Sequence, residues 1–250
     1  MSGLRVLDLF SGIGGFSLGL ERAGMQTIAF CEIDPKARLV LAKHWPNVPI
    51  YEDVTTLKGD HIEADVICGG FPCQDISVAG RGAGLAGARS GLWFQFHRLI
   101  DEIRPRYAII ENVSALRSRG LDTVLGSLAA IGYDAEWHCI PASAVGAPHR
   151  RDRVWIIAYP QCTGRERPFD YRGVLSRALQ AQSKFSHSAF GEWHALARGE
   201  RTIRSCDGVP VQMERNRLKQ LGNAVVPQIP ELIGRVIMAT LPQDLFGRPL

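Results

Sequence analysis

The chain has 250 residues, of which 46% are apolar and 22% are charged, and its mean hydropathy is −0.03. This composition predicts a soluble globular protein with one substantial core and room for a small appendage. The absence of an apolar run of 18 residues argues against a transmembrane helix, and residues 1–5 lack the pattern of a signal peptide. Six cysteines without paired short spacings predict reduced thiols in a cytoplasmic protein.

The net charge of +4 is unevenly distributed. Residues 141–220 carry 14 Lys and Arg against 7 Asp and Glu, whereas the remainder of the chain carries 15 against 18. A basic excess confined to one segment suggests contact with a polyanion. An arginine-rich solvated surface explains the charge equally well.

The chain begins with a strand–turn–helix pattern. Residues 5–10 predict a strand, 11–15 are rich in glycine, and 16–23 have helical spacing closed by a glycine. Backbone N–H groups at such a helix start can hold an anionic group. The next predicted strand, 27–31, ends at Glu32, where a carboxylate can accept hydrogen bonds from both ribose hydroxyls.

The glycine-rich turn does not complete the dinucleotide fingerprint, because Ser17 stands in place of its third glycine. This argues against nicotinamide and flavin dinucleotides and leaves nucleosides with other tails, such as S-adenosylmethionine. Asp53 follows a helix predicted at 35–43 and a short extended piece at 49–52, and could bind an adenine amino group. A turn or helix-cap aspartate is the more common interpretation of a lone Asp.

A buried parallel strand predicted at 66–68 is followed by glycines and then by Cys73. Ligands bind at the carboxyl ends of strands in open α/β sheets, so Cys73 is a candidate nucleophile, with an inert buried thiol as the alternative. Five glycines within residues 80–91 predict a functional lid. Arg81 and Arg89 in this segment could contact phosphates.

Polar side chains also follow or precede later strands. Further helices are predicted at 92–103 and 121–131, and further strands at 107–110, 134–140 and 154–159. Glu111 follows one of these strands, where burial would let it hold a proton for a ring nitrogen; capping of the next helix is the alternative. Arg151 and Arg153 share one face of an extended chain, and paired guanidinium groups suit a carbonyl, a carboxylate or a phosphate.

The segment 160–216 has weak apolar periodicity, and its aromatic residues are scattered among arginines. It predicts a small, loop-rich second domain whose composition suits nucleic acid and also suits ordinary surface loops. Its cysteines and histidines lack zinc-ligand spacing, so no metal site is predicted. An apolar helix predicted at 228–241 should return to the main sheet.

Several of these stretches, in this order, resemble motifs of the DNA (cytosine-5) methyltransferases. The matching motifs are Asp8 to Phe16, Glu32-Ile33-Asp34, Asp53, Gly70-Phe71-Pro72-Cys73-Gln74, Glu111-Asn112-Val113, Arg151-x-Arg153 and Gly222 to Pro227. The resemblance covers roughly residues 4–159 and 207–240. It implies an α/β, Rossmann-like, S-adenosylmethionine-dependent methyltransferase fold with a catalytic domain at 1–159, a small target-recognition domain at 160–216 and a C-terminal segment, 217–250, that returns to the catalytic domain.

The resemblance implies methyl transfer from S-adenosylmethionine to carbon 5 of a flipped-out cytosine in a specific double-stranded DNA sequence, with S-adenosylhomocysteine as product. Cys73 would be the nucleophile, Glu111 would protonate the ring, Arg151 would hold the base's oxygen, and Arg153 would support the loop. The expected cofactor-binding residues are Phe10, Gly12, Gly14, Gly15, Glu32, Ile33, Asp53, Pro72, Leu92 and Asn223. The expected DNA-binding residues are Gln74, Ser77, Arg81 and Arg89.

The family further implies a cytoplasmic monomer in a prokaryotic or phage-infected cell, without membrane contact, that could accompany a cognate restriction endonuclease. Two features depart from the family pattern: His149 stands where glutamine is usual, and the predicted recognition segment is short. A cytosine-5 transfer RNA methyltransferase and a non-catalytic DNA-binding protein that kept the fold are the alternatives. Cys73, Glu111 and Arg151 argue against the second, because mere binding needs none of them.

Overall fold

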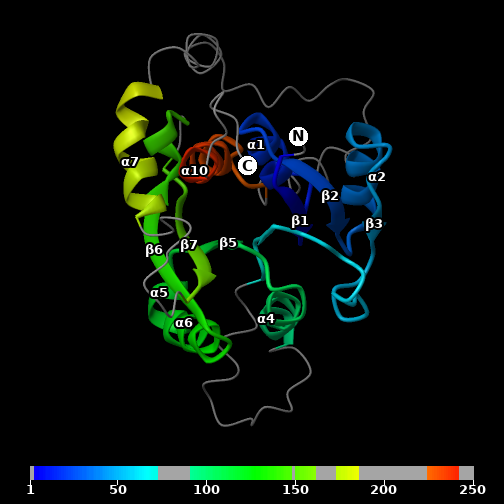
Figure 1. Cartoon of the computed structure of the whole chain (residues 1–250). Coiled ribbons are helices and arrows are strands. Elements are labelled where there is room, and N and C mark those ends of the chain that lie inside the picture. Colours follow the sequence, from blue (N-terminus) through cyan, green and yellow to red (C-terminus); the bar gives the residue numbers. More distant parts are fainter. Residues whose placement is uncertain (1–2, 73–90, 148–149, 162–172, 186–223, 242–250) are drawn as a thin grey trace.

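A seven-stranded sheet in the order β3-β2-β1-β4-β5-β7-β6 organises the molecule (Figure 1). The computed structural model describes residues 3–72, 91–147, 150–161, 173–185 and 224–241. The strands are β1 (Arg5–Leu9), β2 (Gln26–Cys31), β3 (Ile50–Tyr51), β4 (Val66–Gly69), β5 (Tyr107–Val113), β6 (Tyr133–Pro141) and β7 (Asp152–Pro160). The first five strands in chain order, β1 to β5, pair in parallel, whereas β7 runs antiparallel to both β5 and β6.

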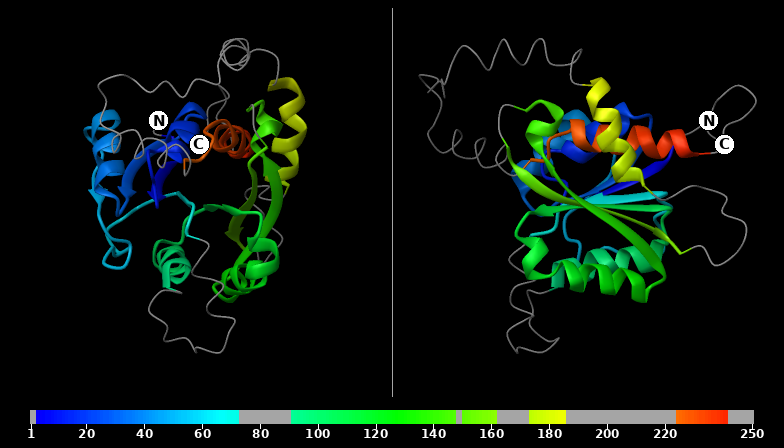
Figure 2. Two further views of the ribbon diagram at one scale, coloured as in Figure 1. Left: turned by 180° about the vertical axis from the view of Figure 1, so that it is seen from behind. Right: turned by 90° about the vertical axis from the view of Figure 1, so that its left-hand side faces the viewer.

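Helices cover both faces of this sheet. They are α1 (Gly15–Arg22), α2 (Pro35–His44), α4 (Gly91–Ile103), α5 (Leu116–Arg119), α6 (Leu121–Ala130), α7 (Val174–Phe185) and α10 (Gln228–Thr240), with a 3₁₀ turn η2 (Ala142–Val145). Figure 2 shows α4, α5 and α6 on one face and α1, α7 and α10 on the other. The predicted Rossmann-like class is therefore confirmed. Among the described helices, none combines the length and apolar character needed to cross a membrane.

The central strands are apolar on both sides because each side is covered by helices. Along β4, for example, Ile67 belongs to the core beneath α4 and α6, whereas Val66 and Cys68 belong to the core beneath α1, α7 and α10. All residues of β4 are buried. The short apolar run is thus explained by a strand in the middle of a three-layer sandwich.

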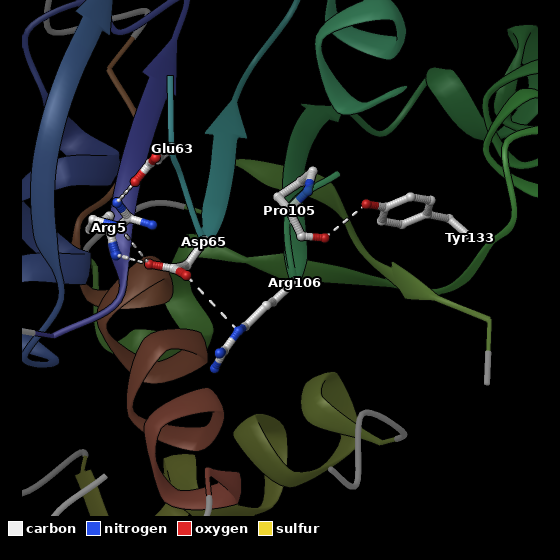
Figure 3. Close-up of polar contacts among 6 residues, drawn as sticks. All are labelled: Arg5, Glu63, Asp65, Pro105, Arg106 and Tyr133. Atoms are coloured by element: carbon white, nitrogen blue, oxygen red, sulfur yellow. Dashed lines mark hydrogen bonds and ion pairs between the residues drawn. The ribbon is translucent and has the colours of Figure 1, made fainter. Parts of the chain in front are cut away.

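Ion pairs tie the amino-terminal ends of the strands together (Figure 3). Arg5 of β1 donates from its backbone N–H and its Nε to Asp65 Oδ2, at 2.9 and 3.2 Å, and its Nη1 lies 2.8 Å from Glu63 Oε2. Arg106, next to β5, places its Nε 3.9 Å from Asp65 Oδ1. This edge is occupied by structural contacts, which leaves the carboxyl-terminal edge for ligands.

β5 and β7 extend furthest beyond the predicted bounds. β5 continues through Val113 and β7 begins at Asp152, because the two strands pair with each other up to the contact of Val113 with Arg153. Glu111 is therefore inside a strand rather than after one, directly opposite Trp155. Nonlocal pairing of this kind overrides the local sequence pattern.

Helix α7 was not predicted, and it lies in the segment expected to be loop-rich. Val174, Leu175 and Ala178 are fully buried, and the backbone N–H of Leu175 donates to Glu136 Oε1 of β6 at 3.0 Å. The helix packs beside α10 and η2. This described part of segment 160–216 therefore belongs to the layer that covers the main sheet, while residues 186–216 lie outside the described part of the chain.

Candidate active site

The glycine-rich turn after β1 is built from left-handed backbone conformations. Phe10, Gly12 and Gly14 have φ angles of 53°, 54° and 86°. Ser11 Oγ donates to the carbonyl oxygen of Asp8 at 2.6 Å and closes the turn. A phenylalanine in the left-handed region costs about 1 kcal/mol or more, and such strained residues cluster at functional sites.

Glu32, at the end of β2, is fixed over this turn. Its Oε2 accepts the backbone N–H of Gly12 and its Oε1 accepts that of Asp34, both at 2.7 Å. Each carboxylate oxygen retains a further lone pair for a ligand hydroxyl. A Cβ placed on Gly12 would meet nothing within 4 Å, so the turn is open to a ligand at Gly12.

Asp8 lies fully buried beneath the turn. Its Oδ2 accepts Ser17 Oγ at 2.7 Å and Ser17 N–H at 3.3 Å, whereas its Oδ1 has no hydrogen-bond partner. Burial raises the pKa of the Asp8 carboxyl to about 7, against the opposing hydrogen bonds from Ser17. No role was predicted for Asp8 from the sequence, where only its place in the turn motif singled it out.

The other predicted cofactor residues in the described ranges surround the same edge. Phe10 packs against Phe96 of α4 with a centroid distance of 6.2 Å, and Leu92 adjoins the same core at the start of α4. Ile33, next to Glu32, is 73% exposed. Pro72 is exposed as well, beyond the end of β4.

Asp53 follows β3 and opens a turn. Its Oδ1 accepts the backbone N–H of Thr55 at 2.8 Å, and this hydrogen bond lowers the pKa of the carboxyl. Asp53 therefore acts as a turn aspartate through its Oδ1, as the alternative interpretation expected. Its adenine-binding role stays a prediction.

Glu111, Arg151 and Arg153 come together on the face of the sheet beneath α10, which suits the joint role implied by the family resemblance. Glu111 Oε1 lies 2.8 Å from Arg153 Nε. A small cavity is lined by these three side chains and by Ala142, Trp155, Val225, Val226 and Ile229. Arg151 has a φ of 34°, a second strained residue at the predicted site. Trp155 was not predicted, and its buried Nε1 has no hydrogen-bond partner.

Burial and the nearby arginine charges have opposite effects on the pKa of Glu111 in this cavity. Burial raises the pKa of the Glu111 carboxyl, while the charges of Arg153 and Arg151 act to lower it. The pKa of Arg151 is lowered, first by burial and then by Arg153. The net effect favours a Glu111 that holds a proton more readily than an exposed glutamate does.

The segment that leads to Cys73 crosses the end of β5. A Cβ placed on Gly70 would lie 2.8 Å from Glu111 Oε2, so this segment passes directly beside the carboxylate. The side-chain Nδ2 of Asn112 donates to the carbonyl oxygen of Phe71 at 2.9 Å. Together these contacts anchor the chain two residues before Cys73 against Glu111. Asn112 had no assigned role, although it stood in the Glu111 motif.

Several predicted residues fall outside the described ranges, and their roles stay predictions. They are Cys73, Gln74, Ser77, Arg81, Arg89, His149 and Asn223.

The profile of the C-5 cytosine-specific DNA methylase family matches residues 4–189 of the chain. This match spans most of the sequence and includes the turn after β1, Glu32, Glu111 and the arginine pair. The chain therefore belongs to the C-5 cytosine-specific DNA methylase family.

Curated relatives agree with this assignment. The Type II methyltransferase M2.BsuMI of Bacillus subtilis (strain 168) is 38% identical over 163 residues, which cover 62% of this chain and 42% of the relative. The Type II methyltransferase M.HhaI of Haemophilus parahaemolyticus is 28% identical over 197 residues, which cover 75% of this chain and 60% of the relative. The chain thus spans about half the length of the curated relatives it matches.

Solved structures share the fold. A DNA modification methyltransferase encoded within an E. coli prophage is 30% identical with a TM-score of 0.51, covering 63% of this chain and 47% of the other. The Dnmt2 methyltransferase of S. pombe is 16% identical with a TM-score of 0.58, covering 94% of this chain and 96% of the other. The second likeness concerns the fold alone.

Proposed function

We propose that the chain transfers a methyl group from S-adenosylmethionine to carbon 5 of cytosine in double-stranded DNA. The observation that carries the proposal is the placement of Glu111, with its raised pKa, between Arg153 and the Gly70 segment that leads to Cys73. The glycine-rich turn after β1 and Glu32, which follows β2, lie at the carboxyl-terminal edge of the same sheet. An acid, a cationic pair and a nucleophile beside a nucleoside site are the groups this reaction needs.

The chemistry follows from the weak nucleophilicity of carbon 5. The Cys73 thiolate adds to carbon 6 while Glu111 donates its proton to ring nitrogen 3, and carbon 5 becomes nucleophilic. Arg151 binds the base's oxygen, and Arg153 holds Glu111 in place. S-adenosylmethionine supplies an activated methyl group. Carbon 5 then loses its proton to a base, the sulfur–carbon 6 bond breaks, and the proton on nitrogen 3 returns to Glu111.

The turn after β1 fits this cofactor. Glu32 would accept hydrogen bonds from the ribose hydroxyls, since both its oxygens are oriented by backbone N–H groups beside open space at Gly12. Phe10 and Ile33 would pack on the adenine, and Asp53 would accept a hydrogen bond from its amino group. Gly14, Gly15, Pro72, Leu92 and Asn223 would make the remaining expected contacts.

The DNA substrate must be distorted for this geometry to operate. Carbon 5 and carbon 6 of a stacked cytosine cannot reach a cavity at a sheet edge, so the base must be extruded from the duplex. We assign the segment 80–91 to closing behind the base, and Gln74, Ser77, Arg81 and Arg89 to DNA contact. The basic segment 141–220 supports an additional polyanion contact.

The biological setting is proposed on the same basis. The matched relatives are Type II methyltransferases, which supports a cytoplasmic enzyme of a prokaryotic or phage-infected cell with a cognate restriction endonuclease. We propose that it acts as a monomer, with the target-recognition region in segment 160–216. Size-exclusion chromatography with light scattering tests the oligomeric state.

Bisulfite sequencing of DNA from cells that express the chain tests the activity and identifies the site. Cys73→Ala should abolish methylation and leave S-adenosylhomocysteine binding intact, because only the nucleophile is removed. Duplex DNA containing 5-fluorocytosine should form a covalent adduct with the parent protein and not with the variant. Methylation of transfer RNA in place of DNA, or full activity in Cys73→Ala, would refute the proposal.

A further inference from the structure

Helix α4 holds the loop 54–59, which directly follows Asp53. Arg98 Nη2 donates to the carbonyl oxygens of Val54, at 3.1 Å, and Leu57, at 2.8 Å. These two carbonyl groups lie at different points of the loop, so one guanidinium group closes it. Hydrogen bonds from a charged donor are stronger than those between neutral groups.

The guanidinium group is itself held in position. Arg98 Nε donates to Gln95 Oε1 at 2.8 Å and Nη1 donates to Glu102 Oε1 at 2.7 Å. Glu102 Oε2 in turn accepts the backbone N–H of Gly59 at 2.8 Å. A Cβ on Gly59 would lie 2.8 Å from Glu102 Cβ, so the loop packs directly on the helix.

A short series of hydrogen bonds leads from Arg98 to Asp53. The backbone N–H of Leu57 donates to the carbonyl oxygen of Asp53 at 3.2 Å, and Thr56 Oγ1 donates to the same oxygen at 3.1 Å. The Thr55 N–H holds the Asp53 side chain through Oδ1. Arg98 therefore fixes the peptide whose N–H group orients Asp53.

The same helix supports the other side of the proposed adenine site. Phe96 contacts Phe10, and Leu92 lies one turn earlier on α4. One rigid element thus positions groups on both sides of this site.

We propose that Arg98 is a positioning residue for adenine recognition, which acts by holding the Val54 and Leu57 carbonyl groups and so orienting the Asp53 carboxylate. This inference rests on the proposed function, because the adenine-bearing cofactor is part of that proposal. Loss of the guanidinium group should release the loop and weaken the selection of adenine over a purine without the amino group.

The test compares binding of S-adenosylhomocysteine and S-inosylhomocysteine by calorimetry. The inosine analogue carries an oxygen where adenine has its amino group, so it cannot donate to Asp53. A hydrogen bond to a charged group contributes about 1.5–3 kcal/mol, which corresponds to a wild-type preference of roughly 10- to 100-fold for the adenosyl ligand. We expect Arg98→Met to lose most of this preference and Arg98→Lys, which can still donate, to retain part of it.

Arg104→Met is the matched control, because Arg104 lies just beyond the same helix and donates to Ile131 rather than to the loop. It should keep the wild-type preference. In ligand-free protein, hydrogen exchange at the Leu57 and Gly59 amides should accelerate in Arg98→Met and not in Arg104→Met. If Arg98→Met does not fold, Arg98→Gln carries the same comparison, since it also lacks the guanidinium group.

Wild-type preference in folded Arg98→Met, together with unchanged exchange of the loop amides, would overturn this inference and leave the proposed function standing. Equal wild-type affinity for the two ligands would overturn it together with the role of Asp53. Absence of binding of either ligand to the wild-type protein would refute the proposed cofactor and this inference with it.

Discussion

Individual residues at the candidate site occupy states that are unfavourable in isolation. Phe10 and Arg151 have left-handed backbones, and Glu111 and Asp8 are carboxyl groups removed from water. Glu111 is held by Arg153 and Phe10 packs on Phe96, whereas Asp8 keeps an oxygen without a partner. Among the described residues, Arg104 is the only other non-glycine with a positive φ. Local strain therefore marks the site as strongly as any motif.

Asp8 provides a prediction about the pH dependence of stability. Its carboxyl has a pKa of about 7 in the folded protein against an ordinary value of 3.8, so the folded state favours the proton. The free-energy cost of this raised pKa to the folded state is absent below pH 3.8, grows between pH 3.8 and about 7, and is complete above about 7. Asp8→Asn removes the ionisation and should raise the free energy of unfolding by up to about 4 kcal/mol at pH 8, with little gain at pH 3.5.

Denaturant unfolding of the ligand-free protein at several pH values measures this effect. Asp60→Asn, at an exposed carboxyl on the surface, is the control and should leave the pH profile unchanged. Parallel pH profiles for Asp8→Asn and the wild-type protein would show that Asp8 carries no such penalty.

At the scale of elements, α1 and α10 pack closely because small residues face the contact. A Cβ on Gly19 of α1 would collide with the carbonyl oxygen of Pro227, and one on Gly234 of α10 would lie 2.7 Å from Ala23 Cβ. The close approach brings Val225 and Val226, which precede α10, to the cavity beside Glu111. Packing of two helices thus contributes a wall of the proposed base site.

Gly19→Ala should separate these helices. The added methyl group meets backbone, which cannot rotate away, so we expect a loss of about 1–3 kcal/mol in unfolding free energy and a lower methylation rate. Gly126→Ala in α6 is the matched control, because its Cβ would meet nothing within 4 Å. That substitution should stabilise the protein by up to about 1 kcal/mol. Equal stability of the two variants would contradict this account of the contact.

At the scale of the whole molecule, the amino-terminal and carboxyl-terminal ends of the strands have different roles. The amino-terminal edge is tied by Arg5, Asp65 and Arg106 (Figure 3). The carboxyl-terminal edge carries Glu32, the turn after β1 and the cavity beside Glu111. Substitutions at the first edge should therefore change stability without changing catalysis.

Asp65→Ala tests this division. It leaves the Arg5 backbone N–H and Nε without their acceptor, while Nη1 keeps Glu63, at a cost of about 1–2 kcal/mol, moderated by partial solvent exposure. The methylation rate per folded molecule should equal that of the wild-type protein. Asp60→Ala, at an exposed aspartate, should stay within about 0.5 kcal/mol of the wild-type stability. A large fall in the rate for Asp65→Ala would show that the edges are coupled.

Local patterns in the sequence were sufficient for much of the fold and for part of the site. Apolar runs ending in glycine or an acid predicted β1, β2, β4 and their ligand-binding edge, because central parallel strands are apolar on both faces. Glu32 was predicted to end the second strand as a ribose ligand; the structure shows it at the end of β2, bonded to Gly12, and the ribose contact stays a prediction. The family resemblance, and not a local pattern, implied that Glu111 and the arginine pair act on one base.

Other features depend on contacts between distant segments, which no local pattern contains. The continuation of β5 through Glu111 results from pairing with β7, and α7 is a helix whose apolar face is explained by β6 and α10. Asp8 Oδ1 and Trp155 Nε1 are buried without a hydrogen-bond partner, which follows from how the helices cover the sheet and not from any local pattern. The sequence by itself determined which strands form and that Glu32 follows the second of them. Only the tertiary structure decided how deeply the polar groups of the site are buried and what holds them, because burial and register arise from nonlocal packing.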